Sequence, residues 1–164
     1  MLSKYLNYLP ENMPITWLGL GSNVLIRDAG INGAVIGTRQ MQDLYQREDG
    51  AIVAQAGVTC AKLARFSSRL GFADAAFFAG IPGTVGGALA MNAGAFGGET
   101  WEWVESVTTM NRQGQCQVLT PKDYHIGYRE VKVNVQSRME TWFVEGVFRF
   151  KSRENVDGMK HIRE

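Results

Sequence analysis

The stretch from Gly80 to Gly97 reads GIPGTVGGALAMNAGAFG, and it lies within a run from Ala75 to Gly98 that carries no charged residue. Its six glycines and one proline disfavour the interiors of helices and strands alike. Two interpretations follow from these residues alone. The stretch is either a packing loop, in which Gly and Ala let two backbones touch, or a wall of bare backbone against a flat, extended ligand. In the second case Thr84 and Asn92 would be its isolated polar groups.

A second glycine-containing segment, Gly19-Leu20-Gly21-Ser22-Asn23, directly follows a predicted strand over residues 15–19. Glycines allow a sharp turn and a close approach, and successive N–H groups in such a turn can bind phosphate oxygens. The alternative is an ordinary loop that ends a strand. A Rossmann fingerprint is excluded because GLGSNV lacks its third glycine, and the P-loop sequence Gly-Lys-Ser/Thr is not present.

Composition predicts a globular domain. The 164 residues are 45% hydrophobic and 20% charged, and the net charge of +1 gives no reason to expect nucleic acid or an anionic membrane as partner. The uncharged run is too broken by Gly, Pro and Asn to span a membrane. Cys60 and Cys116 are far apart, which favours reduced thiols and a cytoplasmic location. His125 and His161 have no partner at ligand spacing, so we expect no metal.

Hydrophobic patterns predict a mixed α+β chain. Thr59 is expected to cap the second helix, with Leu63, Phe66 and Leu70 as its buried stripe and Gly71 as its left-handed end. We expect Trp101 and Trp103 to pack in the core or at its edge. Helices are predicted at 2–9 and 60–70, strands at 15–19, 34–38, 51–57 and 142–150, and a β-hairpin at 104–110 and 115–119.

Three blocks together resemble one family. LGLGSNVLIRD, FFAGIPGTVGGALAMNAGAFGGE and the later GYR at 127–129 are similar, in order and spacing, to the bacterial UDP-N-acetylenolpyruvoylglucosamine reductases, flavoenzymes of peptidoglycan precursor synthesis. The similarity runs from Trp17 to Phe150. It implies an FAD-binding fold of the vanillyl-alcohol-oxidase type with two α+β subdomains. Residues 1–56 would belong to the first and residues 57–150 to the second, and residues 151–164 would form a charged tail leading towards a substrate-binding domain.

The resemblance also implies a reaction and its residues. NADPH would deliver hydride to FAD, which would reduce the enolpyruvyl ether of the UDP-sugar substrate to the lactyl ether of UDP-N-acetylmuramate. Arg129 matches the catalytic arginine that stabilises the developing negative charge, and Tyr128 and Arg129 would contact substrate. Glu99 matches a family glutamate of supporting role. The residues implied to hold FAD are Gly19, Leu20, Gly21, Ser22, Asn23, Gly80, Ile81, Pro82, Gly83, Thr84, Gly86, Gly87, Asn92, Gly94, Ala95 and Gly97.

Some family features are not matched. Val131 stands where the family usually has serine. The family's glycine-rich N-terminal segment has no counterpart here, nor does its C-terminal domain with a proton-donor serine and a catalytic glutamate. We therefore expect a chain truncated at both ends, monomeric unless a separate chain supplies the rest, and with negligible reductase activity alone.

Two alternatives remain. The first is an oxidase of the same flavin fold, although neither His125 nor Cys60 lies in a motif for covalent flavin attachment. The second is a non-catalytic flavin-binding remnant of a split or truncated gene.

Overall fold

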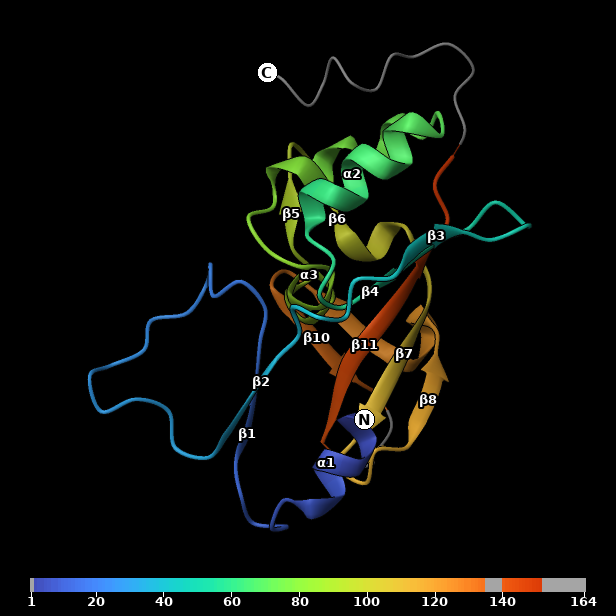
Figure 1. The fold of residues 1–164 in the computed structure, drawn as a ribbon. Coiled ribbons are helices and arrows are strands. Elements are labelled where there is room, and N and C mark those ends of the chain that lie inside the picture. Colours follow the sequence, from blue (N-terminus) through green and yellow to red (C-terminus); the bar gives the residue numbers. More distant parts are fainter. Residues whose placement is uncertain (1, 135–139, 152–164) are drawn as a thin grey trace.

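The computed structural model describes residues 2–134 and 140–151, and an antiparallel sheet forms its centre (Figure 1). The strand order of this sheet is β3-β4-β11-β7-β8. The strands are β3 (Leu44–Gln46), β4 (Ile52–Gln55), β7 (Val104–Asn111), β8 (Cys116–Leu119) and β11 (Thr141–Phe148). The β7–β8 hairpin is confirmed, and β11 lies between β4 and β7 with both pairings antiparallel. The two longest strands are therefore central, where both of their edges are paired.

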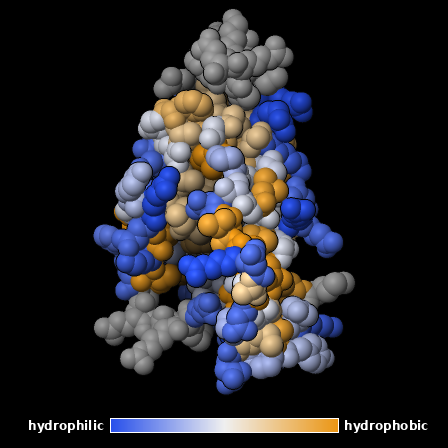
Figure 2. All heavy atoms as spheres, turned by 90° about the vertical axis from the view of Figure 1, so that its left-hand side faces the viewer, coloured by the Kyte–Doolittle hydropathy of each residue, from blue (hydrophilic) through white to orange (hydrophobic). Residues whose placement is uncertain are grey.

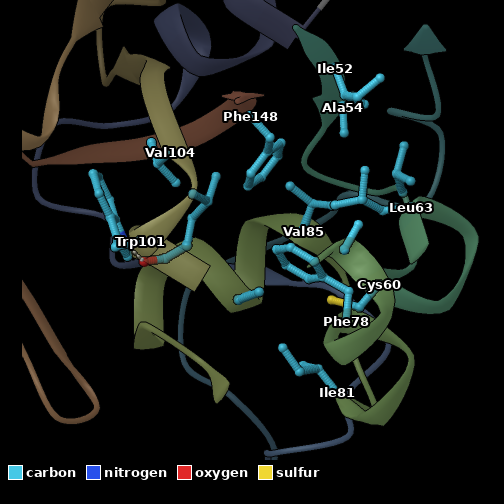
Figure 3. Close-up of a cluster of buried hydrophobic side chains, with 14 of the residues drawn as sticks. Ile52, Ala54, Cys60, Leu63, Phe78, Ile81, Val85, Trp101, Val104 and Phe148 are labelled. Carbon is cyan, nitrogen blue, oxygen red and sulfur yellow. Dashed lines mark hydrogen bonds between the residues drawn. The ribbon is translucent and has the colours of Figure 1, made fainter. Parts of the chain in front are cut away.

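Helical segments contribute the other side of the main core. They are α2 (Cys60–Arg69), the 3₁₀ segment η1 (Ala73–Gly80) and α3 (Val85–Met91). Figure 3 shows Leu63 and Cys60 of α2, Phe78 of η1 and Val85 of α3 converging with Phe148 of β11, and all five are fully buried. Burial raises the pKa of the Cys60 thiol to about 12, so this thiol stays neutral and unreactive.

The start and end of α2 follow from its sequence. The side chain of Thr59 accepts a hydrogen bond from the Lys62 N–H at 3.2 Å, as predicted for the N-cap. Gly71 has a φ of +85°, the left-handed conformation that commonly ends a helix. Leu63 is buried, as predicted. The prediction that Leu70 belongs to the buried stripe is wrong, because Leu70 is 40% exposed. The reason is that Leu70 is the C-cap residue, beyond the last helical position.

A smaller unit precedes the main sheet. Helix α1 (Leu2–Tyr8) packs on the parallel pair β1 (Ile15–Leu18) and β2 (Ala34–Gly37), and Leu6, Ile15 and Ile36 form its core. The Trp17 ring of β1 stacks on the Trp142 ring of β11 with centroids 5.4 Å apart. The long connection from β1 to β2, blue in Figure 1, extends away from the sheet on the side where the site is found.

Sequence patterns missed several short elements. The glycine-rich block contains the helix α3 and the first strand of the hairpin β5 (Gly94–Ala95) and β6 (Gly98–Glu99). A second hairpin joins β9 (Tyr124–Gly127) to β10 (Glu130–Val133), and the 3₁₀ turns η2 (Thr100–Glu102) and η3 (Pro121–Asp123) precede β7 and β9. Over residues 2–134 and 140–151, no helix is long and apolar enough to cross a bilayer.

Candidate functional site

One cavity brings together all three sequence blocks. It has a volume of about 750 Å³, within the range of cofactor sites, and lies between the β1–β2 connection, α3 and the two hairpins. Figure 2 views the molecule from the side of that connection, and hydrophobic residues gather in the middle of this face. The lining residues are Trp17, Leu18, Gly19, Gly21, Ser22, Asn23, Val24, Ile81, Pro82, Gly83, Thr84, Gly87, Ala88, Met91, Asn92, Ala93, Gly94, Ala95, Gly97, Gly98, Glu99, Tyr128 and Arg129.

The two glycine-containing segments touch each other at one end of this cavity. A Cβ added to Gly19 would lie 2.6 Å from Thr84 Oγ1, and one added to Gly83 would lie 3.4 Å from Ser22 Oγ. Only a residue without a side chain fits at Gly19 while Thr84 keeps its position. Gly21 has a φ of +78°, so the chain turns immediately after this contact. The hydroxyls of Ser22 and Thr84 are thereby brought to a backbone turn of the kind that binds anions.

One face of α3 forms the floor of the cavity. Thr84 is the N-cap of this helix, and its Oγ1 accepts a hydrogen bond from the Gly87 N–H at 3.4 Å. Gly87, Ala88 and Met91 line the cavity because residues three and four apart share one face of a helix. Gly87 and Ala88 on this face leave the helix backbone open to close approach by a ligand.

Asn92 connects α3 to the rest of the site. Its amide donates to Glu99 Oε2 at 2.9 Å and to the Gly127 carbonyl at 3.2 Å, and its Oδ1 accepts from the Trp101 N–H at 3.1 Å. Both amide hydrogens are therefore used within the protein. Any contact of Asn92 with a ligand would have to use its remaining surface. Its three hydrogen bonds tie the end of α3 to the β9–β10 hairpin and to Glu99 and Trp101.

Arg129 occupies a strained position at the tip of that hairpin. Because Gly127 pairs with Glu130, the turn consists of Tyr128 and Arg129 alone. The φ of Arg129 is +55°, in the left-handed region that an arginine adopts at a cost of about 1–2 kcal/mol. The guanidinium lies 5.8 Å from the centroid of the exposed Tyr128 ring. Strain of this kind is typical of functional positions.

The charges of the cavity are few. Among the described residues that line it, only Glu99 and Arg129 carry a charge. The other polar groups are the hydroxyls of Ser22 and Thr84, the amides of Asn23 and Asn92, the Tyr128 phenol, the Trp17 indole and the backbone. Such a surface suits a large, flat ligand that is held by close packing, a few hydrogen bonds and one cation.

Most of the predicted site residues lie together, and a few do not. Arg129, Tyr128 and all but three of the predicted FAD contacts line the cavity; Leu20, Gly80 and Gly86 are not among the lining residues. Gly86 instead packs α3 against Ala56, the residue after β4. An added Cβ would lie 2.8 Å from the Ala56 Cβ, and the Gly86 N–H donates to the Ala56 carbonyl at 2.9 Å. Leu20 is 45% exposed.

Sequence reasoning also missed some lining residues. Trp17 and Leu18 precede the first glycine segment in β1, Val24 follows it, and Ala88 and Met91 belong to the unexpected helix. The recurrence Thr84, Gly87, Ala88, Met91 at helical spacing was the signal that could have identified the last two. Ala93 and Gly98 flank residues that were predicted.

Replacing Asn92 by glycine is expected to lower the free energy of unfolding by about 2 kcal/mol. Glycine keeps the left-handed backbone of Asn92, whose φ is +41°, so the loss would come from the three side-chain hydrogen bonds. Urea unfolding of both proteins measures the difference. Asn23→Gly, in the exposed loop, is the control and should stay within about 0.5 kcal/mol of the unaltered chain. Equal stability of the two variants would contradict the connecting role of Asn92.

Comparisons with known proteins agree on one relationship. A family model described as the FAD binding domain matches residues 2–120. The UDP-N-acetylenolpyruvoylglucosamine reductase of Nitrosomonas eutropha is 50% identical over 170 residues, which cover 99% of this chain and 51% of the relative. The reductase of the same name from Coxiella burnetii is 49% identical, covering 91% of this chain and 52% of the relative. The chain thus spans about half the length of the curated relatives it matches.

Solved structures show the same α+β fold. The UDP-N-acetylenolpyruvylglucosamine reductase of Thermus caldophilus matches 98% of this chain and 56% of its own with a TM-score of 0.78 at 25% identity. Glucooligosaccharide oxidase from Acremonium strictum, whose FAD is bound through cysteinyl and histidyl links, matches with a TM-score of 0.55 at 12% identity. At that identity the second match shows the fold alone.

Proposed function

The chain belongs to the FAD binding domain family, and from that premise we propose that it is the FAD-holding part of a UDP-N-acetylenolpyruvoylglucosamine reductase. The observation that supports this most is the single cavity lined by all three sequence blocks. Two curated relatives that cover nearly the whole chain at about half identity carry that enzyme's name. The likeness to an oxidase of the same fold is far weaker in sequence.

The residues present fit FAD. The joined segments at Gly19 and Thr84 offer hydroxyls and backbone N–H groups of a glycine turn, which suits a pyrophosphate. The α3 face, with Gly87 and Ala88, lets a flat ring system approach the helix backbone. The lining, in which only Glu99 and Arg129 carry a charge among the described residues, suits the flavin itself. We propose that the predicted FAD contacts that line the cavity hold the cofactor, whereas Gly80 and Gly86 support them from behind.

Bound FAD would supply hydride transfer from NADPH to the enolpyruvyl double bond of the UDP-sugar. The role of Arg129 is to stabilise the negative charge that then develops towards the substrate carboxylate, because its guanidinium is permanently charged and can donate two parallel hydrogen bonds. Tyr128 would bound the substrate region beside it. Asn92 would position the hairpin that carries both residues.

Further features of the whole enzyme remain part of this proposal. NADPH as donor, a cytoplasmic location, a role in cell shape and division through peptidoglycan synthesis, and a monomeric state follow from the resemblance. The division at residues 56 and 57 and a tail over 151–164 stay predictions; residues 152–164 lie outside the described part.

Replacing Gly19 by alanine is expected to raise the Kd for FAD at least about 10-fold. The new Cβ would displace the Thr84 side chain, because Gly19 and Thr84 are too close to leave room for it. The displacement would open the contact between the Gly19–Asn23 segment and the glycine-rich block. Loss of the Thr84 cap should also lower stability by about 1 kcal/mol. Quenching of flavin fluorescence on titration measures the Kd. Gly37→Ala is the matched control because open space surrounds its added Cβ; identical FAD affinity in the two variants would argue against the proposed site.

A further inference from the structure

Phe96 has a backbone conformation that is unusual for its type. Gly94 pairs with Glu99 and Ala95 with Gly98, so the β5–β6 turn consists of Phe96 and Gly97. Their φ values are +52° and +83°. Two consecutive positive values define a type I′ turn, in which Asn-Gly or Gly-Gly is strongly preferred. A bulky aromatic residue at the first position is a true outlier.

The Phe96 ring is exposed but supported. Its exposed fraction is 80%, although a phenyl ring is among the side chains that gain most from burial. A Cβ on Gly80 would overlap the ring edge, so the ring lies directly over the bare backbone of Gly80 at the end of η1. The missing side chain of Gly80 is thus explained, because it makes room for the Phe96 ring.

The turn that carries the ring borders the cavity, and Phe96 is not itself among the lining residues. Both of its chain neighbours, Ala95 and Gly97, line the cavity, as does Ile81 next to its supporting glycine. A strained turn that holds a large apolar ring in water beside a ligand cavity is destabilising in the free protein. A bound ligand that covers the ring would remove it from water and so offset this destabilisation.

We propose that Phe96 is a ligand-contacting residue whose phenyl ring packs against a flat ring system of bound flavin adenine dinucleotide. This inference rests on the proposed function, because it takes its ligand from there. Stacking on an aromatic side chain needs only a π-face, which both the isoalloxazine and the adenine of the dinucleotide offer. Binding of FMN and of ADP distinguishes the two ring systems, because FMN contains only the isoalloxazine and ADP only the adenine.

The test is Phe96→Asn in the full 164-residue chain. The Kd for FAD, from flavin fluorescence quenching, is expected to rise about 5- to 100-fold, as for loss of one stacked ring. The melting temperature without ligand is expected to rise, because asparagine followed by Gly97 is the preferred type I′ pair. Phe96→Trp should bind FAD within about 3-fold of the unaltered chain. FMN affinity falls in Phe96→Asn if the ring contacts the flavin, and ADP affinity falls if it contacts the adenine.

Tyr8→Asn is the control, since Tyr8 is an aromatic residue 86% exposed at the end of α1, and its FAD affinity should not change. Unchanged FAD affinity in Phe96→Asn would overturn the proposed contact and leave the FAD assignment intact. If Phe96→Asn lowers the melting temperature, Phe96→Leu is the deciding variant, because leucine keeps the apolar bulk but has no π-face. Weaker FAD binding by Phe96→Leu supports the contact. An FAD affinity of Phe96→Leu equal to that of the unaltered chain overturns it. Failure of the unaltered chain to bind FAD would instead reject the proposed function, and this contact with it.

Discussion

Replacing Arg129 by asparagine is expected to lower kcat for the reductase reaction about 10²- to 10³-fold while stabilising the fold. The loss is the size found when one preorganised donor to a developing negative charge is removed. Arg129 and Glu99 are the charged residues among the described cavity lining, and only Arg129 is a cation. We therefore expect that no other described lining residue could replace its charge. Arg129→Lys should recover part of the rate, because a lysine keeps the charge but not the two parallel hydrogen bonds.

The gain in stability has a separate origin. Asparagine tolerates the left-handed conformation at +55° that costs an arginine about 1–2 kcal/mol. Loss of the exposed contact between the guanidinium and the Tyr128 ring offsets about 0.5 kcal/mol of this. The net expected gain is about 0.5–1.5 kcal/mol in the free energy of unfolding. A lower kcat together with a higher free energy of unfolding would identify Arg129 as a residue that serves function at the expense of stability.

The rate is best measured in a chimera. This chain would replace the matching half of the Nitrosomonas eutropha reductase, to which it is 50% identical over almost its whole length. NADPH oxidation in the presence of the UDP-sugar substrate gives kcat. Arg69→Asn, on the exposed side of α2, is the control and should change kcat less than about 3-fold. A chimera with Arg129→Asn that keeps its full rate would remove Arg129 from the proposed mechanism.

Secondary structure was predictable where one side of an element faces the core. The alternation in residues 142–150 and the turn NRQG between two apolar runs correspond to β11 and the β7–β8 hairpin. Thr59 and Gly71 marked the ends of α2 because capping is a local interaction. These elements carry their signal in neighbouring residues, so a single sequence contains it.

The helix α3 was not predictable in the same way. Its sequence VGGALAM has two glycines, which lower helix propensity by about 1 kcal/mol each. The helix forms because Val85 and Leu89 are fully buried against the sheet, and because Thr84 and Asn92 cap its ends. Tertiary packing thus overrides local preference here. The helix face that carries Gly87 lines the cavity, which is the position that the interpretation of the block as a ligand wall requires.

The site itself followed from the joint presence of three blocks more than from any one of them. Nothing in the sequence places Gly19 against Thr84, or joins Asn92 to Gly127, because these contacts link segments far apart in the chain. The strain at Phe96 and Arg129 is likewise invisible, since it depends on two-residue turns whose register is set by strand pairing. Sequence reasoning therefore named most of the residues that line the cavity, but not the contacts that position them.

The 164-residue chain alone is expected to bind FAD and yet to oxidise NADPH with the UDP-sugar substrate at least about 10²- to 10⁴-fold more slowly than the chimera. That range is the contribution of general acid catalysis. The resemblance assigns proton donation to a serine and a further catalytic role to a glutamate, and neither has a match in this sequence. The chain covers 51% of the Nitrosomonas eutropha relative, so substrate-positioning surface would be lost as well and would lower the rate further.

The comparison separates cofactor binding from catalysis, because both proteins share the cavity and Arg129. A flavin absorbance band in the purified chain, together with a rate close to the uncatalysed one, would show that the cavity holds its cofactor without completing the reaction. Adding the remaining half of the relative as a separate protein should restore part of the rate if the two halves associate. Turnover by the chain alone at the rate of the chimera would contradict the assignment of proton donation and would place the acid among the residues of this chain. Glu99 and Tyr128 would then be the candidates, because both line the cavity and both have a side-chain group that can donate a proton.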